Sequence, residues 1–311
     1  MKFEEIKSNI DFKALNDFRL EKKKIIDSRT NKILISCLLT IIIVLYFIWP
    51  HVHWIQAIIV SIILFVILYG ILVKLFVRKY LNQFIIHFRD NVISVLLNSL
   101  KFDVKLNLEK VLSRSMFNEG KLFTNFNVFN PEEFFEGTID ELPISFSELL
   151  LEYKSRRYTN RIFYGFFIKL HYNLDTNLII DVIEDSTNSD VLQKLNFKRN
   201  QLVKIEDSEF ERYYVVYSNN VDLTKSLISN TVIDNLKKLN VIAKNRVYFS
   251  IRNGSIHVAY NDERNYFEID KDKTIEELTE THFNDLNDIF VILKEIKMFF
   301  DSNIIPAIPK N

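Results

Sequence analysis

The densest group of side chains that could do acid–base chemistry is a patch of four carboxylates. Its members are Glu206, Asp207, Glu209 and Glu211. Paired carboxylates can act as general acid and general base when their surroundings separate their pKa values. Carboxylates this close in sequence more often form the solvated rim of a strand or turn, and we interpret the patch in that way. A membrane-bound hydrolase that uses this patch is the weaker alternative.

A second group could bind a metal. His51 and His53 alternate in sequence and would share one face of an extended loop. Two ligands do not complete a zinc site, and no acid or thiol lies near them in the sequence. We therefore interpret both histidines as bystanders in a loop and assign no metal site.

Two further features have a structural interpretation. Glu132, Glu133 and Glu136 flank the pair Phe134–Phe135, a pattern that predicts charged turn residues around buried aromatic rings. Gly165 lies in the middle of an aromatic strand, where glycine predicts a bulge or a close approach of another backbone. A ligand that presses on Gly165 is the alternative.

Several motifs that identify enzymes are missing from the sequence. It contains no phosphate-binding glycine loop, nucleophile elbow, metalloprotease helix or cysteine pair, and only five glycines in total. The single cysteine, Cys37, lies in an apolar segment and can neither form an intrachain disulfide nor serve as a soluble nucleophile. Lys and Arg number 40, as do Asp and Glu, so no basic surface for nucleic acid is expected. We expect no cofactor and no catalytic site.

The most informative segment carries no Asp, Glu, Lys or Arg at all. It lies between Lys32 and Lys74 and is interrupted once, by the loop around Pro50. One membrane-spanning helix needs about 20 apolar residues, so this length predicts two spans joined as a hairpin. Neither half has the polar face of a soluble core helix.

Charges at the ends of the two spans predict their orientation. Cationic residues precede the first span and follow the second, whereas the connecting loop has no Lys or Arg. This bias predicts that both chain termini lie on the cytoplasmic side of a bacterial inner membrane. The expected anchors at the membrane interface are Lys32, Trp49, Trp54, Lys74, Arg78 and Lys79.

The rest of the chain predicts an α+β fold. An amphipathic helix is expected before the spans, and a helix continuing from the second span is followed by a second helical stretch over 108–116. Alternation of apolar and polar residues predicts an antiparallel hairpin from 143–148 and 161–172, with further strands at 178–182, 202–205 and 213–217. A helix over 223–239, a hairpin whose turn is Asn253–Gly254, and a long helix over 275–302 follow.

These elements give three expected regions. Residues 1–31 form a cytoplasmic amphipathic helix, 32–78 a transmembrane hairpin, and 79–311 a cytoplasmic domain of antiparallel sheet packed with helices. A boundary between two lobes could fall near 184–190, where the sequence is polar.

The ordered set of motifs resembles a bacterial two-pass membrane family called domain-of-unknown-function family 3137 (DUF3137). The resemblance rests on the segments 113–117, 133–137, 144–149, 162–167, 203–218, 247–260 and 267–268. It covers nearly the whole chain. The resemblance implies a two-pass membrane protein and no defined activity or active-site residues.

Our leading hypothesis is a membrane-anchored, non-enzymatic cytoplasmic module that binds a protein or a small ligand as a scaffold or sensor. Its expected partners are the lipid bilayer and either another protein or a second copy that packs against the spans. Small residues at helical spacing in the spans, among them Ser36, Thr40 and Ser61, suit such packing. The alternative is an oligomeric pore or membrane-disrupting effector, lined by these residues and Gln56 and gated by the cytoplasmic domain.

Overall fold

The computed structural model describes residues 3–48, 54–100, 102–107, 109–123, 125–184, 201–269 and 273–308. These residues form helices and one antiparallel sheet, as the sequence predicted. They divide into two compact units: Met1–Val95 with Ile269–Glu280, and Leu96–Glu268 with Thr281–Asn311. His51, His53 and Trp49 lie outside the described residues, as does most of the suggested lobe boundary.

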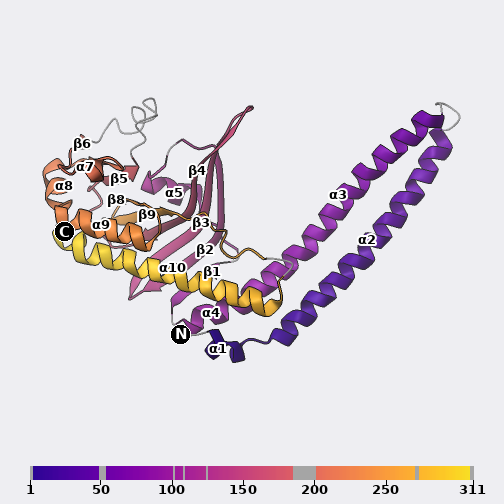
Figure 1. Cartoon of the computed structure of the whole chain (residues 1–311), viewed down its shortest axis with the longest axis horizontal. Helices are drawn as coiled ribbons and strands as arrows, with labels where there is room; N and C mark the ends of the chain where they lie inside the picture. Colours follow the sequence, from indigo (N-terminus) through magenta and orange to yellow (C-terminus); the bar gives the residue numbers. More distant parts are fainter. Residues whose placement is uncertain are drawn as a thin grey trace. The chain divides into compact units, whose positions relative to one another are not determined.

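The first unit is built on two long helices that form a hairpin (Figure 1). Its elements are α1 (Phe3–Ile6), the 3-10 turn η1 (Lys7–Asn9), α2 (Phe12–Ile48), α3 (Trp54–Phe88) and the π-helical segment η2 (Arg89–Ile93). The expected N-terminal helix is interrupted at Ile10, and its second part continues without a break into the first apolar stretch. The Asp11 carboxylate starts that part, because it accepts a hydrogen bond of 2.9 Å from the Ala14 N–H.

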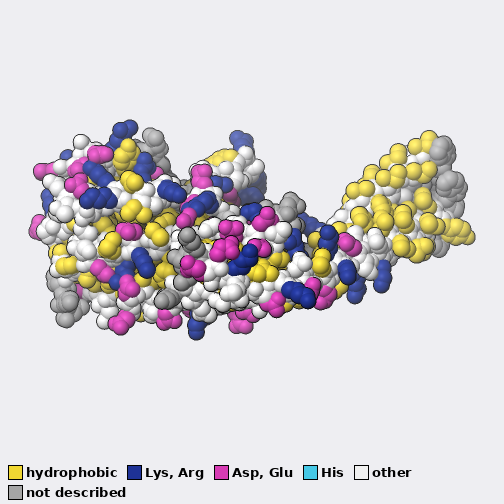
Figure 2. Space-filling model, turned by 60° about the horizontal axis from the view of Figure 1, so that its bottom comes forward, with side chains coloured by type: hydrophobic (Ala, Val, Ile, Leu, Met, Phe, Trp, Pro, Cys, Tyr) yellow, Lys and Arg dark blue, Asp and Glu magenta, His cyan; other side chains and the backbone are white. Residues whose placement is uncertain are grey.

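Both helices of the hairpin are long and apolar enough to cross a membrane. Figure 2 shows hydrophobic side chains over much of their outer surface, with Lys and Arg towards the ends that lie far from Ile48 and Trp54 in the sequence. Large exposed apolar side chains on this scale are rare in soluble proteins. They include Ile35, Leu39, Ile42, Ile43, Ile59, Ile62, Ile63, Val66 and Ile67.

Small side chains lie inside the hairpin. Cys37 and Ser61 are each only 2% exposed, so they fill the space between helices that pack closely. Ser36, Thr40 and Gln56 are exposed, and the Thr40 hydroxyl donates a hydrogen bond of 2.9 Å to the Ser36 carbonyl of its own helix. Lys32, Lys74, Arg78 and Lys79 are also exposed. Ser61 is therefore not available to line a pore in this arrangement.

The described residues of the second unit include a nine-stranded antiparallel sheet with the order β1-β2-β3-β4-β9-β8-β5-β7-β6. The strands are β1 (Asp103–Asn107), β2 (Val128–Ile139), β3 (Leu142–Lys154), β4 (Thr159–Leu170), β5 (Ile180–Glu184), β6 (Gln201–Val203), β7 (Tyr214–Ser218), β8 (Val247–Arg252) and β9 (Ser255–Asn261). Strands on both sides of the segment 184–190 belong to this one sheet.

Helices cover both faces of the sheet (Figure 1). They are α4 (Ser94–Ser99), α5 (Arg114–Gly120), α7 (Ser208–Glu211), α8 (Val221–Leu227), α9 (Asn230–Ile242), α10 (Ile275–Asn303) and the turn η3 (Ile305–Ala307). Phe290 of α10 contacts Phe146 on one face, and Phe117 of α5 contacts Phe167 on the other. Consecutive strand residues point to opposite faces, so an aromatic core forms on each side of the sheet.

Local signals predicted several of these elements well. The β8–β9 hairpin turns at Asn253 and Gly254, whose φ angles are 52° and 73°, as a type I′ turn requires. The long terminal helix and the β3–β4 hairpin are also as predicted.

Three expectations were wrong. Residues 108–116 are not one helix, because α5 begins only at Arg114, where the Ser113 hydroxyl accepts from the Met116 N–H. The single helix over 223–239 is two helices, since Asn220 caps α8 and the chain leaves helical geometry at Ile228. Glu132, Glu133 and Glu136 lie within β2 and not in a turn. A bulge in that strand replaces the expected turn.

Gly165 lies where β4 pairs with β9. A Cβ atom at this position would lie 2.1 Å from the Tyr260 carbonyl oxygen and 2.9 Å from the Asn261 Cα. The prediction of a close backbone approach is therefore confirmed, and the neighbour is the protein's own strand. Gly165 allows the two halves of the sheet to join without a distortion of the ladder.

We predict that Gly165→Ala destabilises the sheet by more than about 3 kcal/mol, because the methyl group collides with backbone atoms that cannot rotate away. Chemical unfolding of the full-length protein, followed by far-ultraviolet circular dichroism, measures this change. Gly70→Ala is the control, since a Cβ there meets no atom within 4 Å. Equal stability of the two variants would contradict the role assigned to Gly165.

His257 lies in the core on the α5 face and is completely buried. Neither ring nitrogen has a hydrogen-bond partner among the described residues. Burial, together with the smaller effect of the nearby charges of Lys169, His171 and Arg252, lowers the pKa of His257 to about 3. The Glu119 carboxylate lies 3.9 Å from the His257 Nε2 but is engaged by Lys169 at 2.6 Å. The folded protein therefore holds His257 neutral.

This neutral histidine predicts a pH dependence of stability. The unfolded chain binds one proton more than the folded chain between pH 6.5 and about 3, so stability is complete above pH 6.5 and falls below it. Relative to His257→Phe, the wild-type free energy of unfolding should drop by roughly 2 kcal/mol between pH 6.5 and 4.5. Urea unfolding at several pH values measures the difference. A difference that stays constant with pH would refute a neutral His257.

Candidate binding pocket

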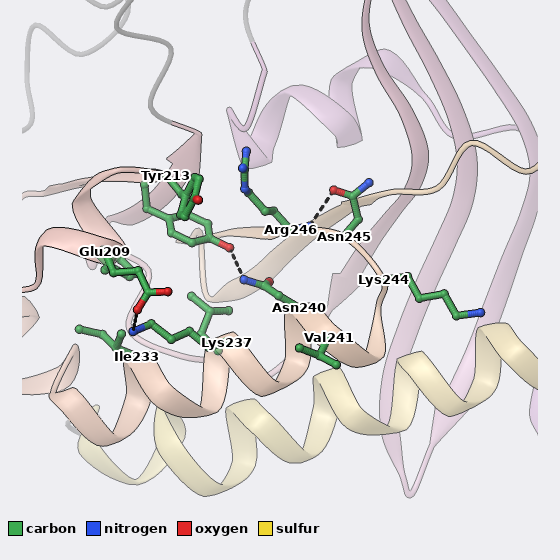
Figure 3. A pocket seen from close by; sticks show the side chains of 12 residues that line it. Glu209, Tyr213, Ile233, Lys237, Asn240, Val241, Lys244, Asn245 and Arg246 are labelled. Carbon is green, nitrogen blue, oxygen red and sulfur yellow. Dashed lines mark hydrogen bonds and ion pairs between the residues drawn. The ribbon is translucent and has the colours of Figure 1, made fainter.

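An open pocket of about 590 Å³ lies in the second unit, between α7, the start of β7, α9 and the turn before β8 (Figure 3). Pockets that bind small ligands have volumes of about 300–1,000 Å³. The lining residues are Glu209, Phe210, Tyr213, Tyr214, Ile233, Leu236, Lys237, Asn240, Val241, Lys244, Asn245 and Arg246.

The amphipathic helix α9 supplies the floor of the pocket. Ile233, Leu236, Lys237, Asn240 and Val241 follow the i, i+3, i+4, i+7, i+8 spacing that places side chains on one stripe of a helix. Ile233 and Leu236 are buried, whereas Val241 is 78% exposed at the rim. An apolar base therefore opens to solvent beside polar groups.

Asn240 links α9, which forms the floor of the pocket, to the sheet by two hydrogen bonds. Its side-chain nitrogen donates a hydrogen bond of 2.8 Å to the Tyr214 hydroxyl, and its oxygen accepts one of 2.9 Å from the Val247 N–H. Burial raises the pKa of Tyr214 to about 12, so the hydroxyl keeps its proton. Asn240 thereby fixes the distance between α9, β7 and β8.

A cation lies at each end of the pocket (Figure 3). At one end Lys237 forms an ion pair of 2.7 Å with Glu209. At the other end the Arg246 guanidinium stacks over the Tyr213 ring, 4.1 Å from its centre, and lies 3.7 Å from the Glu184 carboxylate. Stacking on a ring holds a guanidinium in a fixed plane while its outer N–H groups stay available.

The charges of the lining favour an anion. Lys237, Lys244 and Arg246 are cationic, whereas Glu209 is the one carboxylate among the twelve lining residues. A partly exposed guanidinium with a planar fork of donors binds carboxylate, sulfonate or phosphate groups well. The pocket can thus hold a molecule with an apolar body and an anionic end.

The acidic patch of the sequence is brought only partly into this pocket. Glu209 lines it and is exposed. The Asp207 carboxylate caps α7 by accepting a hydrogen bond of 2.8 Å from the Phe210 N–H, and Glu211 accepts one of 3.0 Å from the Ile205 N–H. Glu206 is exposed and does not line the pocket. The patch has helix-capping and ion-pairing roles here.

Sequence reasoning missed the polar residues that define the pocket. Asn240 and Arg246 come from a helix and a turn about 30 residues after the acidic patch, and neither stands in a recognisable motif. One signal was present, because Lys237 and Asn240 interrupt the apolar stripe of α9. Polar residues on the buried stripe of a helix mark a place where the stripe opens to solvent or to hydrogen-bond partners.

Residues 161–298 match the family described as protein of unknown function (DUF3137). This part of the chain is similar to DUF3137, and the match covers less than half of the 311 residues. The DUF3137 segment begins in β4 and ends near the end of α10, so it contains every residue that lines the pocket.

In a separate comparison with curated proteins, no protein matches the chain. Among solved structures, the crystal structure of the mycobacterial trehalose monomycolate transport factor A, TtfA, aligns over 70% of this chain and 94% of that chain. The alignment has a TM-score of 0.36 and a sequence identity of 12%.

Proposed function

We propose that this protein is a membrane-anchored module that binds a small anionic, amphipathic ligand in the pocket between α7, β7 and α9. The observation that carries the proposal is the Arg246 guanidinium, which is stacked on Tyr213 at the edge of an apolar floor. An anion at the guanidinium gains charge-assisted hydrogen bonds, and an apolar body gains burial on the floor.

The membrane anchor in this proposal is the hairpin of α2 and α3. Its exposed apolar surface suits lipid, and the cations at its ends suit a cytoplasmic location for both termini of the chain. The exposed Ser36, Thr40 and Gln56 offer small polar groups where a second copy or the span of a partner protein can pack. A ligand sensor at the bacterial inner membrane is the arrangement that these features support.

The ligand can be tested by native mass spectrometry of the full-length protein, released gently from its own membranes. We expect a small anionic mass on the wild type and at least an approximately tenfold lower occupancy in Arg246→Gln, a loss of about 1.4 kcal/mol or more. Arg212→Gln is the matched control. Its guanidinium also lies over the Tyr213 ring, at 5.5 Å, but it does not line the pocket.

Other results would redirect or refute the proposal. Equal ligand occupancy in both arginine variants would move the ligand away from this pocket. A wild type that carries a stoichiometric foreign protein and no small mass would make the protein a scaffold. A homo-oligomer without any bound mass would favour the pore.

The orientation can be tested by cysteine labelling of intact cells. Ser302→Cys lies on an exposed position of α10 and should be protected from a membrane-impermeant maleimide until the cells are lysed. The native Cys37 is only 2% exposed and should add little background. Val52→Cys, at a position between the two apolar stretches of the sequence, should react from outside. Labelling of Ser302→Cys in intact cells would reverse the orientation.

A further inference from the structure

A bulge in β2 places two consecutive glutamates beside a third on the neighbouring strand. The register of β2 against β3 pairs Glu132 with Glu148 and then shifts, so that Phe134 pairs with Ser147 and Glu133 is the extra residue. The Ser147 hydroxyl donates a hydrogen bond to the Glu132 carbonyl and holds the bulge in place. A bulge re-aims a side chain that would otherwise point to the opposite face of the sheet.

As a result, three carboxylates converge. One oxygen from each of Glu132, Glu133 and Glu148 lies within 4.8 Å of the other two. Ca²⁺ binds oxygen ligands at 2.3–2.6 Å, so a single ion between oxygens with this spacing can contact all three. Like charges at this separation repel each other unless a proton or a cation compensates them.

Glu148 is the most deeply buried of the three carboxylates. It is 1% exposed, and neither carboxylate oxygen has a hydrogen bond of normal geometry from the described residues. Burial, together with the charges of Glu133 and Glu132, raises the pKa of Glu148 to about 8, although hydrogen bonds from the Tyr164 hydroxyl and the Tyr266 N–H act in the opposite direction. No cationic side chain is among these groups.

A buried hydroxyl lies on the same face. Tyr260 is completely buried, and its hydroxyl has no hydrogen-bond partner among the described residues. The strand registers place it in one row with Glu148, with Phe166 between them. Buried polar groups without partners are uncommon and often mark a bound ion or water.

We propose that Glu132, Glu133 and Glu148 form a binding site for a hard divalent cation, Ca²⁺ or Mn²⁺. Carboxylate oxygens are the ligands that these ions prefer. Two of the three ligands are buried, which disfavours Mg²⁺ because that ion usually keeps several waters. Glu132 is exposed and gives the ion a route from solvent. The site belongs to the first half of the sheet and shares no residue with the ligand pocket.

Mn²⁺ titration of full-length protein that has been stripped with EDTA tests the site. The electron paramagnetic resonance signal of free Mn²⁺ should decrease until about one ion per chain is bound, and Ca²⁺ should compete. Glu132→Gln and Glu148→Gln should each weaken Mn²⁺ binding at least about tenfold, by analogy with losses seen when groups around a metal are removed. Glu132 is exposed, so its substitution leaves the core intact.

The matched control is Glu136→Gln on the same strand. Its carboxylate accepts hydrogen bonds of 3.0 Å from Asn107 and 3.2 Å from Lys110 and is not a member of the cluster. This variant should bind Mn²⁺ as the wild type does. Absence of Mn²⁺ and Ca²⁺ binding to the wild type at millimolar concentration would overturn the proposal. Binding that survives either Glu132→Gln or Glu148→Gln would overturn it as well.

Discussion

The pairing of β4 with β9 is the contact on which the sheet domain depends. It joins the strands that come before residue 170 in the chain to those that come after residue 180, and it runs from Gly165 with Asn261 to Leu170 with Ile256. Among the described strands, this ladder is the pairing that connects β1–β4 with the rest of the sheet. The absence of a side chain at Gly165 is what permits the ladder to begin there.

Each half of the sheet presents a different kind of polar chemistry. The half that contains β7 and β8 has a wide pocket with cations at its ends and a hydrogen-bonded amide at its base. The half that contains β2 and β3 has a narrow cluster of carboxylates, two of them buried. Because the two regions lie on one hydrogen-bonded framework, the stiffness of the sheet holds both of them in place.

The sequence predicted those parts of the fold that depend on neighbours in the chain. The Asn253–Gly254 turn, the β3–β4 hairpin and the long terminal helix are local structures with strong composition signals. Strand β1 was missed although its residues alternate between polar and apolar side chains, because it has only five residues and pairs with β2 across about 30 residues of the chain.

The ligand pocket and the carboxylate cluster were not predicted from the sequence, for a similar reason. Their members are distant in sequence, and the bulge that turns Glu133 towards Glu148 depends on the strand register. Sequence spacing identified Glu209, whereas Asn240 and Arg246 reach the same pocket only through the packing of α9. Local patterns find the elements, but the contacts between elements determine which side chains meet.

The strand order also has a consequence for how copies of this protein behave when they are crowded. Among the residues that the structure describes, β1 and β6 form the edges of the sheet, and they contain five and three residues. Short edges offer few unpaired backbone groups to another chain. A hairpin that confines the protein to the plane of a bilayer would bring neighbouring sheets together often. The short edge strands would then limit aggregation between the edges of neighbouring sheets at the high local concentration of the confined protein.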